Sequence, residues 1–223
     1  MNGTRLAIAV VAIGALAAGA SYLRKETIAD SHRQARQLVV HYTLSRLDQP
    51  IVLLGDSLTE ASTLPRTYCG HPVINAGLNG ASSYSDLGTW LIEALDGRRG
   101  AAILVALGTN DALLKRSTQD FETSYAALLA QLAKVTDHPA VLGIPSIEVR
   151  GNAKAELRDE TRKQIDAFNE WLPALAAKSG ATFAALPPMP DPHTIDGVHL
   201  DAAGYAVGDA AVLKGVSGIC SKP

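Results

Sequence analysis

A serine, a histidine and an aspartate stand where they can act together as a nucleophile, its base and an orienting acid. Ser57 follows the apolar run 51–54 after a Gly-Asp step, and Asp196 precedes His199 by three residues near the C-terminus. A serine hydroxyl needs a positioned imidazole to remove its proton, and a carboxylate commonly fixes the tautomer of that imidazole. We therefore expect Ser57, His199 and Asp196 to form a triad for acyl transfer.

Acyl transfer also requires hydrogen-bond donors for the negatively charged oxygen of the tetrahedral intermediate. We expect three donors: the backbone N–H groups of Ser57 and Gly77 and the side-chain amide of Asn110, which follow three different apolar runs. Donors that are fixed where negative charge develops often contribute most to such catalysis. Each residue alone is equally compatible with a turn or a helix cap, so the prediction depends on the combination.

The elements that must position these residues follow a regular pattern from residue 50 onward. Short apolar runs alternate with longer helical patterns, which predicts a parallel sheet between layers of helices. The expected strands lie at residues 51–54, 73–74, 102–107, 140–144 and 182–186, and the expected helices at residues 83–95, 118–135, 153–179 and 202–213. Ligands of such sheets bind at the carboxyl ends of the strands, where the candidate residues stand.

Four short motifs in this part of the chain resemble the successive blocks of the SGNH hydrolases, also called the GDSL esterase/lipase superfamily. They are GDSL at 55–58, NAG at 75–77, GTND at 108–111 and DGVHL at 196–200. The resemblance implies a three-layer α/β/α sandwich with a parallel, flavodoxin-like sheet of five strands. It also implies a serine esterase without a metal or an organic cofactor.

The same resemblance implies a role for each candidate residue. Ser57 would be the nucleophile, His199 the base and Asp196 the partner of the base. Gly77 and Asn110 would complete the oxyanion hole with the N–H group of Ser57.

The first 23 residues differ in character from the rest of the chain. Residues 6–23 carry no charge, and the small residues that end at Ala20 fit cleavage by signal peptidase. If it is not cleaved, this run is just long enough to span a bilayer. We expect residues 1–23 to direct export to the periplasm or cell envelope, as a signal peptide or a membrane anchor. Residues 24–49 are interpreted as a helical linker, and residues 50–223 as the hydrolase domain.

Composition and cysteine content narrow the partners. The net charge is −2 and no basic stripe is interleaved with aromatic residues, which argues against nucleic acid as a partner.

The two cysteines could form a disulfide. Cys69 precedes the second expected strand and Cys220 follows the last expected helix. Because strand starts and helix ends share one face of a parallel α/β fold, an exported chain could join these two cysteines in a disulfide.

Several other polar residues lie near the expected site. We interpret Asp56 and Asp111 as structural hydrogen-bonding residues that shape their loops. His193 is interpreted as a solvated loop histidine, with a position lining the cleft as the alternative. Glu148 and Arg150 follow the fourth expected strand, where contact with substrate and an ordinary surface position are both open.

The expected substrate is an acyl ester, short-chain or O-acetyl, on an envelope polysaccharide or a lipid. Two alternatives remain at this stage. The first is an acyltransferase that passes the acyl group to an envelope glycan instead of water. The second is a non-catalytic carbohydrate-binding module on a hydrolase scaffold, which the low aromatic content of 5% disfavours.

Overall fold

A computed structural model describes residues 31–148 and 155–220 of the 223. The expected export segment 1–23, the start of the expected linker and Arg150 lie outside the described residues. Contacts divide the chain into two units, Met1–Val39 and Val40–Pro223. Residues 31–39 are helical in the first unit, and residues 40–44 are helical in the second. Among the helices that are described, none is both long and apolar enough to cross a membrane.

The second unit is built on a six-stranded sheet. Its strands are β1 (Ile51–Gly55), β2 (Thr67–Tyr68), β3 (His71–Gly77), β4 (Ala102–Ala106), β5 (Pro139–Leu142) and β6 (Thr182–Ala184). They lie in the order β2-β3-β1-β4-β5-β6. All pairings are parallel except that of β2 with β3. The predicted five parallel strands are confirmed. The sixth strand, β2 at the edge of the sheet, was not predicted, because two residues are too few to show a strand pattern in the sequence.

Besides the helical residues 40–44, seven helical segments accompany these strands in the described part of the second unit. They are α2 (Ser57–Glu60), α3 (Leu87–Leu95), α4 (Thr109–Leu113), α5 (Thr118–Leu132), α6 (Ala155–Lys178), α7 (Ala202–Val216) and the 3-10 turn η1 (Ser217–Ile219). The four long helices match the sequence prediction to within a few residues. The short α2 and α4 directly follow β1 and β4, so they begin at the edge where the candidate residues stand.

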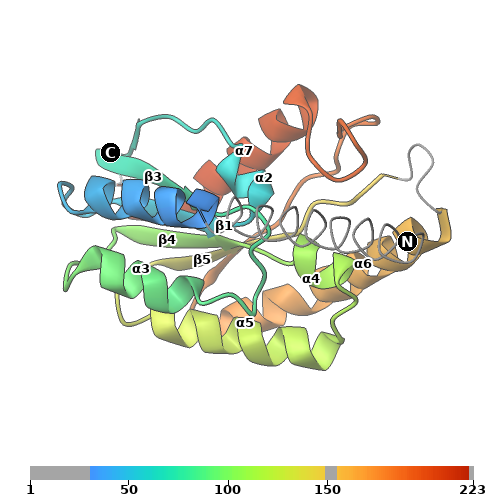
Figure 1. Ribbon diagram of the computed structural model, residues 1–223, viewed down its shortest axis with the longest axis horizontal. Coiled ribbons are helices and arrows are strands. Elements are labelled where there is room, and N and C mark those ends of the chain that lie inside the picture. The colour runs from blue at the N-terminus through green and yellow to red at the C-terminus, as the bar shows by residue number, and fades with distance from the viewer. Residues whose placement is uncertain (1–30, 149–154, 221–223) are drawn as a thin grey trace, which may run out of the picture. The chain divides into compact units, whose positions relative to one another are not determined.

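Alternating side chains of the central strands supply two cores, one on each face of the sheet. Val52 and Leu54 of β1 pack with α3, α5 and α6, while Ile51 and Leu53 pack with α7. Figure 1 shows α3 and α5 on one side of the strands and α7 on the other. Since β1 is buried on both faces, its run of four apolar residues reads as a central strand.

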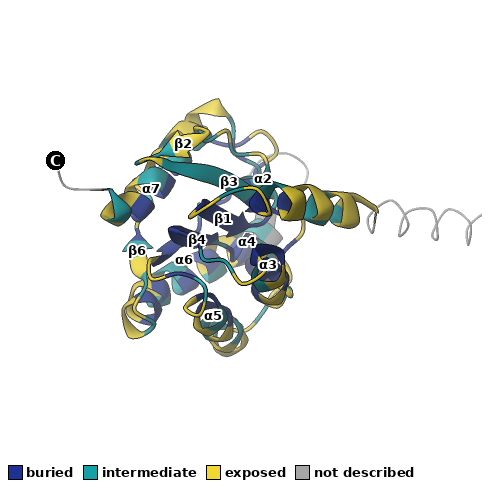
Figure 2. Cartoon of the chain, turned by 90° about the vertical axis from the view of Figure 1, so that its left-hand side faces the viewer, coloured by how far each residue is buried: buried dark blue, intermediate teal, exposed yellow. Residues whose placement is uncertain are grey.

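The first core also includes Val40 and Leu44, which are 2% and 1% exposed. The guanidinium of Arg98 donates to the carbonyl of Leu44 at 2.9 Å. Val40 and Leu44 therefore belong to the same compact unit as the sheet. Figure 2 shows that buried residues concentrate along β1 and β4.

Strand register places the ends of three strands at one level. Gly55 at the end of β1 pairs with Gly77 of β3 and with Ala106 of β4. The residues that follow these strands therefore leave the sheet side by side at its carboxyl edge. This is the physical basis for a site assembled from Ser57 and Asn110, which are 53 positions apart in the sequence.

Candidate active site

Ser57, His199 and Asp196 lie in a hydrogen-bonded line at the carboxyl edge of the sheet. The Oγ of Ser57 is 3.1 Å from Nε2 of His199, and Nδ1 of His199 is 2.7 Å from Oδ2 of Asp196. The imidazole is 42% exposed and the Asp196 carboxylate 52% exposed. A substrate can therefore reach the pair from solvent, and the base already lies within hydrogen-bonding distance of the nucleophile.

The Asp196 carboxylate is held in its charged form. Desolvation raises its pKa, but hydrogen bonds from the His199 ring and from the backbone N–H groups of His199 and Val198 outweigh it and lower the pKa to about 2. The two backbone donors lie 2.8 Å and 2.9 Å from Oδ1. A carboxylate that accepts from the backbone keeps Oδ2 directed at the imidazole, so Nδ1 of His199 carries the proton and Nε2 accepts one.

Local sequence explains how β1 delivers Ser57. Asp56 is 2% exposed and accepts a hydrogen bond of 2.9 Å from the N–H of Leu58, which caps the four-residue helix α2. Gly55 has no room for a side chain, because a Cβ there would approach Oγ1 of Thr59 to 1.9 Å. The chain can thus turn directly from strand to helix, as the sequence interpretation of Asp56 as a structural residue expected.

Gly77, an expected oxyanion donor, lies at the end of β3 against α2. Its N–H donates to Oδ1 of Asn75 at 3.0 Å, so this group is already engaged. The amide of Asn75 in turn donates to the carbonyls of Thr59 and Glu60 in α2. A Cβ at Gly77 would come within 2.2 Å of the Glu60 nitrogen. Gly77 is therefore packed closely beneath α2, with its N–H engaged by Asn75.

Asn110 follows β4, the strand that pairs with β1. It is the second residue of α4, and its side-chain amide donates to the carbonyl of Ala81 at 2.8 Å. The neighbouring Asp111 is fully buried and accepts from the N–H and hydroxyl of Ser83 at 3.0 Å and 2.6 Å. Burial raises the pKa of Asp111. Asp111 thus joins the loop after β3 to α4, which is the structural role expected of it.

Sequence reasoning missed Gly80, which lies in the loop after β3, directly before Ala81. It has φ +77° in a turn closed by a 3.0 Å hydrogen bond from the Ala81 N–H to the Leu78 carbonyl. Its own N–H donates to no protein atom in the described part of the chain. The Asn79-Gly80 dipeptide is a sequence signal for a turn of positive φ that would have drawn attention to it.

His193 was interpreted as a solvated loop histidine, and that interpretation is wrong. Its side chain is 8% exposed and lies 3.2 Å from the carboxylate of Glu148, measured from Nδ1 to Oε1. The same Nδ1 is 2.9 Å from the carbonyl of Pro190. Glu148 was expected either to contact substrate or to lie on the surface. Its carboxylate instead points to the loop that carries Asp196 and His199, where it accepts from the N–H groups of His193 and Thr194. No local pattern marks the Glu148 carboxylate, because His193 and Thr194, which donate to it, lie 45 and 46 residues away.

Two further features bear on ligands. Within residues 31–148 and 155–220, no group of His, Cys, Asp and Glu side chains is arranged to hold a metal ion. A cavity of about 50 Å³ is lined among others by Leu58, Leu200 and Tyr205. Leu58 is the chain neighbour of Ser57 and Leu200 is the chain neighbour of His199.

Comparisons with known proteins place this chain among others of similar sequence and fold. The model of the GDSL-like Lipase/Acylhydrolase family matches residues 53–207. Among curated proteins, no sequence matches.

Solved structures share the fold at low sequence identity. A Streptococcus pneumonia protein provisionally described as a platelet activating factor is similar with a TM-score of 0.71 and 19% identity, over 89% of this chain and 99% of that one. Axe2, an acetylxylan esterase from Geobacillus stearothermophilus, is similar with a TM-score of 0.58 and 16% sequence identity, over 75% of this chain and 94% of that one. LAE5, an alpha/beta hydrolase enzyme from the metagenome of Lake Arreo, is similar with a TM-score of 0.57 and 17% sequence identity, over 78% of this chain and 97% of that one.

Proposed function

Since this chain belongs to the GDSL-like lipase/acylhydrolase family, and is thus a serine ester hydrolase, we propose that Ser57, His199 and Asp196 are the triad with which it cleaves an acyl ester. The observation that carries the proposal is the continuous hydrogen-bonded line from Ser57 Oγ to His199 and on to Asp196. A serine needs such a base and orienting acid to act as a nucleophile at neutral pH.

The reaction proceeds through an acyl-enzyme. Ser57 Oγ attacks the ester carbonyl while Nε2 of His199 takes the hydroxyl proton, and Asp196 stabilises the imidazolium that results. The tetrahedral intermediate collapses, the ester C–O bond breaks, and His199 returns the proton to the departing alcohol. Water, deprotonated by the same imidazole, then attacks the acyl-enzyme and releases the acid with Ser57 restored.

Three N–H groups are proposed for the oxyanion hole. They are the backbone N–H groups of Ser57 and Gly80 and the second N–H of the Asn110 amide. One amide hydrogen of Asn110 is donated to Ala81, which fixes the direction of the other and brings the Gly80 turn alongside. Gly80 takes the place first assigned to Gly77, whose N–H is bonded to Asn75. Preorganised donors of this kind act without reorganisation during the reaction.

A small acyl group, acetyl or another short chain, is the proposed substrate. The cavity lined by Leu58 and Leu200, the chain neighbours of Ser57 and His199, measures about 50 Å³, roughly a third of the ~150 Å³ cavity that admits benzene. The similarity in fold to Axe2, an acetylxylan esterase, is consistent with an O-acetyl ester on a polysaccharide.

Export to the cell envelope is proposed together with this substrate. The structure joins Cys69 and Cys220 in a disulfide, and their Cα atoms lie 5.0 Å apart. Disulfides persist in oxidising compartments such as the bacterial periplasm, which supports an exported location. An envelope polysaccharide or lipid would then be the carrier of the ester.

Replacing Ser57 by Ala tests the proposed function directly. We expect the Ser57→Ala variant to lose at least about 10⁴-fold in kcat on a chromogenic acetyl ester, because the nucleophile is gone. Wild-type protein should react with a fluorophosphonate probe and the variant should not. Ser45→Ala, which alters an exposed serine bonded to the Tyr42 carbonyl, is the matched control and should keep full activity.

Full activity of Ser57→Ala would refute the mechanism. Adding a sugar acceptor to the same assay separates hydrolysis from acyl transfer. Free acid as the product supports the hydrolase, whereas an acylated sugar would favour the transferase. An intact wild-type protein without ester cleavage or probe labelling would leave only a binding role.

A further inference from the structure

The base and its acid partner lie on a loop that folds back on itself. A β-bridge pairs Thr194 with Leu200, and the Ile195 N–H donates to the His199 carbonyl at 2.8 Å. Closer to α7, the Asp201 N–H donates to the His193 carbonyl at 2.9 Å. These bonds define the shape of residues 193–201, which we call the catalytic loop. They do not fix its distance from Ser57, which stands on a different element.

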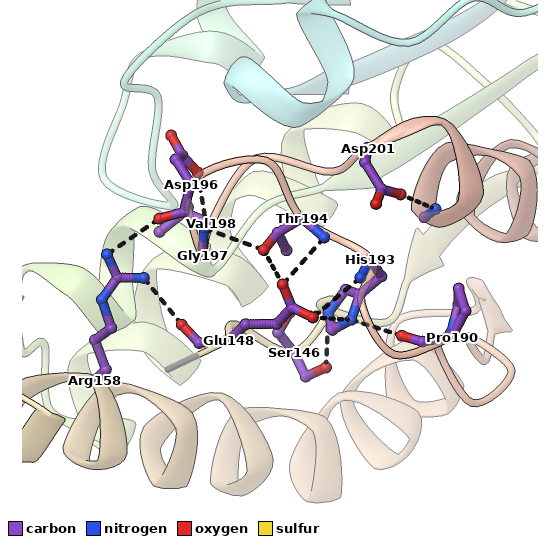
Figure 3. Close-up of polar contacts among 11 residues, drawn as sticks. Ser146, Glu148, Arg158, Pro190, His193, Thr194, Asp196, Gly197, Val198 and Asp201 are labelled. Carbon is purple, nitrogen blue, oxygen red and sulfur yellow. Dashed lines mark hydrogen bonds and ion pairs between the residues drawn. The ribbon is translucent and has the colours of Figure 1, made fainter. Parts of the chain in front are cut away.

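The buried carboxylate of Glu148 binds the first arm of this loop (Figure 3). It accepts hydrogen bonds from the N–H of His193 at 3.0 Å and from the N–H of Thr194 at 3.2 Å, and another from the Thr194 hydroxyl. Nδ1 of the His193 ring lies 3.2 Å from Oε1 of the same carboxylate. Only 10% of the Glu148 side chain is exposed, so water competes little for these bonds.

The tip of the loop is held by backbone bonds and by Arg158 of α6. The Glu148 N–H donates to the Gly197 carbonyl at 2.8 Å. One end of the Arg158 guanidinium donates to the Glu148 carbonyl at 2.9 Å, and the other to the Asp196 carbonyl at 3.1 Å. Figure 3 shows the guanidinium bridging these two carbonyls. Arg158 thus ties Asp196 to the same segment that binds His193 and Thr194.

Gly197 is shaped to this contact. It has φ +94°, and a Cβ there would approach Nη1 of Arg158 to 1.7 Å and the Glu148 carbonyl to 2.8 Å. The loop therefore lies directly against the guanidinium with no side chain between them. Such a close approach indicates that Arg158 supports the backbone of the loop and is not an incidental surface cation.

We propose that Glu148 and Arg158 are positioning residues that hold the catalytic loop where His199 reaches Ser57. The proposal rests on the proposed function and deepens it. Asp196 and His199 are themselves about half exposed, so their own hydrogen bond is open to competition from water. Glu148 and Arg158 connect the loop to the segment after β5 and to α6, two elements that do not carry a catalytic residue.

The size of the effect follows from the sensitivity of catalysis to geometry. A displacement of about 1 Å can cost on the order of 10²-fold in rate, even when it arises away from the chemistry. In Glu148→Gln an amide NH₂ replaces one of the carboxylate oxygens, both of which accept backbone N–H groups. We therefore expect kcat to fall about 10- to 100-fold with KM within about threefold, since neither residue is proposed to bind substrate.

The test compares full-length wild-type protein with Glu148→Gln, Arg158→Ala and Arg158→Lys. For each we would measure kcat and KM on an acetyl ester, and both the rate constant and the final extent of fluorophosphonate labelling. Positioning predicts slower labelling that still reaches the wild-type extent, with Arg158→Lys between wild type and Arg158→Ala. Glu160→Gln and Arg162→Ala, which alter exposed ion pairs on the same helix, are the controls and should match wild type.

Wild-type kcat in Glu148→Gln and Arg158→Ala would overturn the proposal. A reduced extent of labelling at an unchanged rate constant would also overturn it, because that outcome means less folded protein and intact geometry. If Glu148→Gln does not fold, the two Arg158 variants decide alone. Wild-type activity that is lost in Ser57→Ala shows that the proposed function holds, whatever the positioning variants do. An inactive wild type would refute both proposals.

Discussion

Asp56 is the residue with the most unusual electrostatic environment near the nucleophile. It is 2% exposed, and desolvation raises its pKa to about 7, against the opposing effect of backbone N–H groups of Leu58 and Thr59. Its role as a helix cap requires an acceptor oxygen and not a charge. Ionising the Asp56 carboxyl group therefore lowers the stability of the folded state. This loss of stability appears only above the pH at which Asp56 of the unfolded chain releases its proton.

This environment predicts a pH-dependent effect of Asp56→Asn, which keeps an acceptor oxygen without the charge. Because the folded pKa lies above the ordinary value of 3.8, the folded state retains a proton that the unfolded state has released, so wild-type stability falls as pH rises toward about 7. Between pH 5 and pH 7 the variant should gain roughly 2–3 kcal/mol in free energy of unfolding relative to wild type. Urea unfolding at both pH values measures this gain.

Asp137→Asn is the control, because that carboxylate is 82% exposed. Its difference from wild type should stay nearly constant over the same range. If the free energy of unfolding had the same pH dependence in wild type and in Asp56→Asn, the raised pKa of the buried Asp56 would be contradicted.

At the level of elements, the position of the nucleophile depends on how closely α2 packs on β3. Helix α2 has only four residues, so it has little stability of its own. It is held from below by the Asn75 amide and by the absence of a side chain at Gly77. The NAG motif therefore supports the nucleophile helix, which is a different task from binding an oxyanion.

Gly77→Ala should be strongly destabilising for this reason. Its Cβ would lie 2.2 Å from a backbone nitrogen of Glu60, which no rotamer change can relieve. We expect a loss of about 3 kcal/mol or more in free energy of unfolding, together with reduced kcat as α2 shifts. Gly70→Ala is the matched control: φ is +82° but nothing lies within 4 Å, so about 1 kcal/mol is expected. Similar costs for the two variants, measured by urea unfolding, would disprove the packing role.

For the whole molecule, the Cys69–Cys220 disulfide connects the start of β3 to the segment after α7 across 151 residues. It lies at the amino ends of the strands, away from Ser57. Closing so long a loop restricts the unfolded chain, and removing such a bond typically costs 2–5 kcal/mol. The disulfide therefore stabilises the fold without taking part in the chemistry.

The double variant Cys69→Ser, Cys220→Ser should accordingly separate stability from activity. We expect its free energy of unfolding to fall by about 2–5 kcal/mol while kcat on an acetyl ester at 25 °C stays within about twofold of wild type. Reduction of the wild-type protein with dithiothreitol should reproduce the loss in stability. A large fall in kcat in the folded variant would show that the disulfide reaches the active site after all.

The sequence alone determined the order of the elements and the edge at which the site is assembled. Residues 51–54 and 102–107 are apolar on both strand faces, a pattern that is typical of the central strands of a covered parallel sheet. The helices at 118–135 and 202–213 were predicted because a helix that buries one face repeats its apolar residues at short, regular intervals along the sequence. Ser57 and Asn110 were found because each stands shortly after such a strand, and the Asp196–His199 pair because it lies in the loop that leads into the last helix.

Only the tertiary structure decided which neighbours these residues meet. The N–H of Gly77 is bonded by Asn75, His193 is buried against Glu148, and Arg158 reaches the Asp196 carbonyl. These contacts depend on the distance between segments that lie far apart in the chain and on side-chain directions, neither of which leaves a periodic trace in the sequence. Polar partners that converge from separate loops are visible only once the sheet register has brought those loops together.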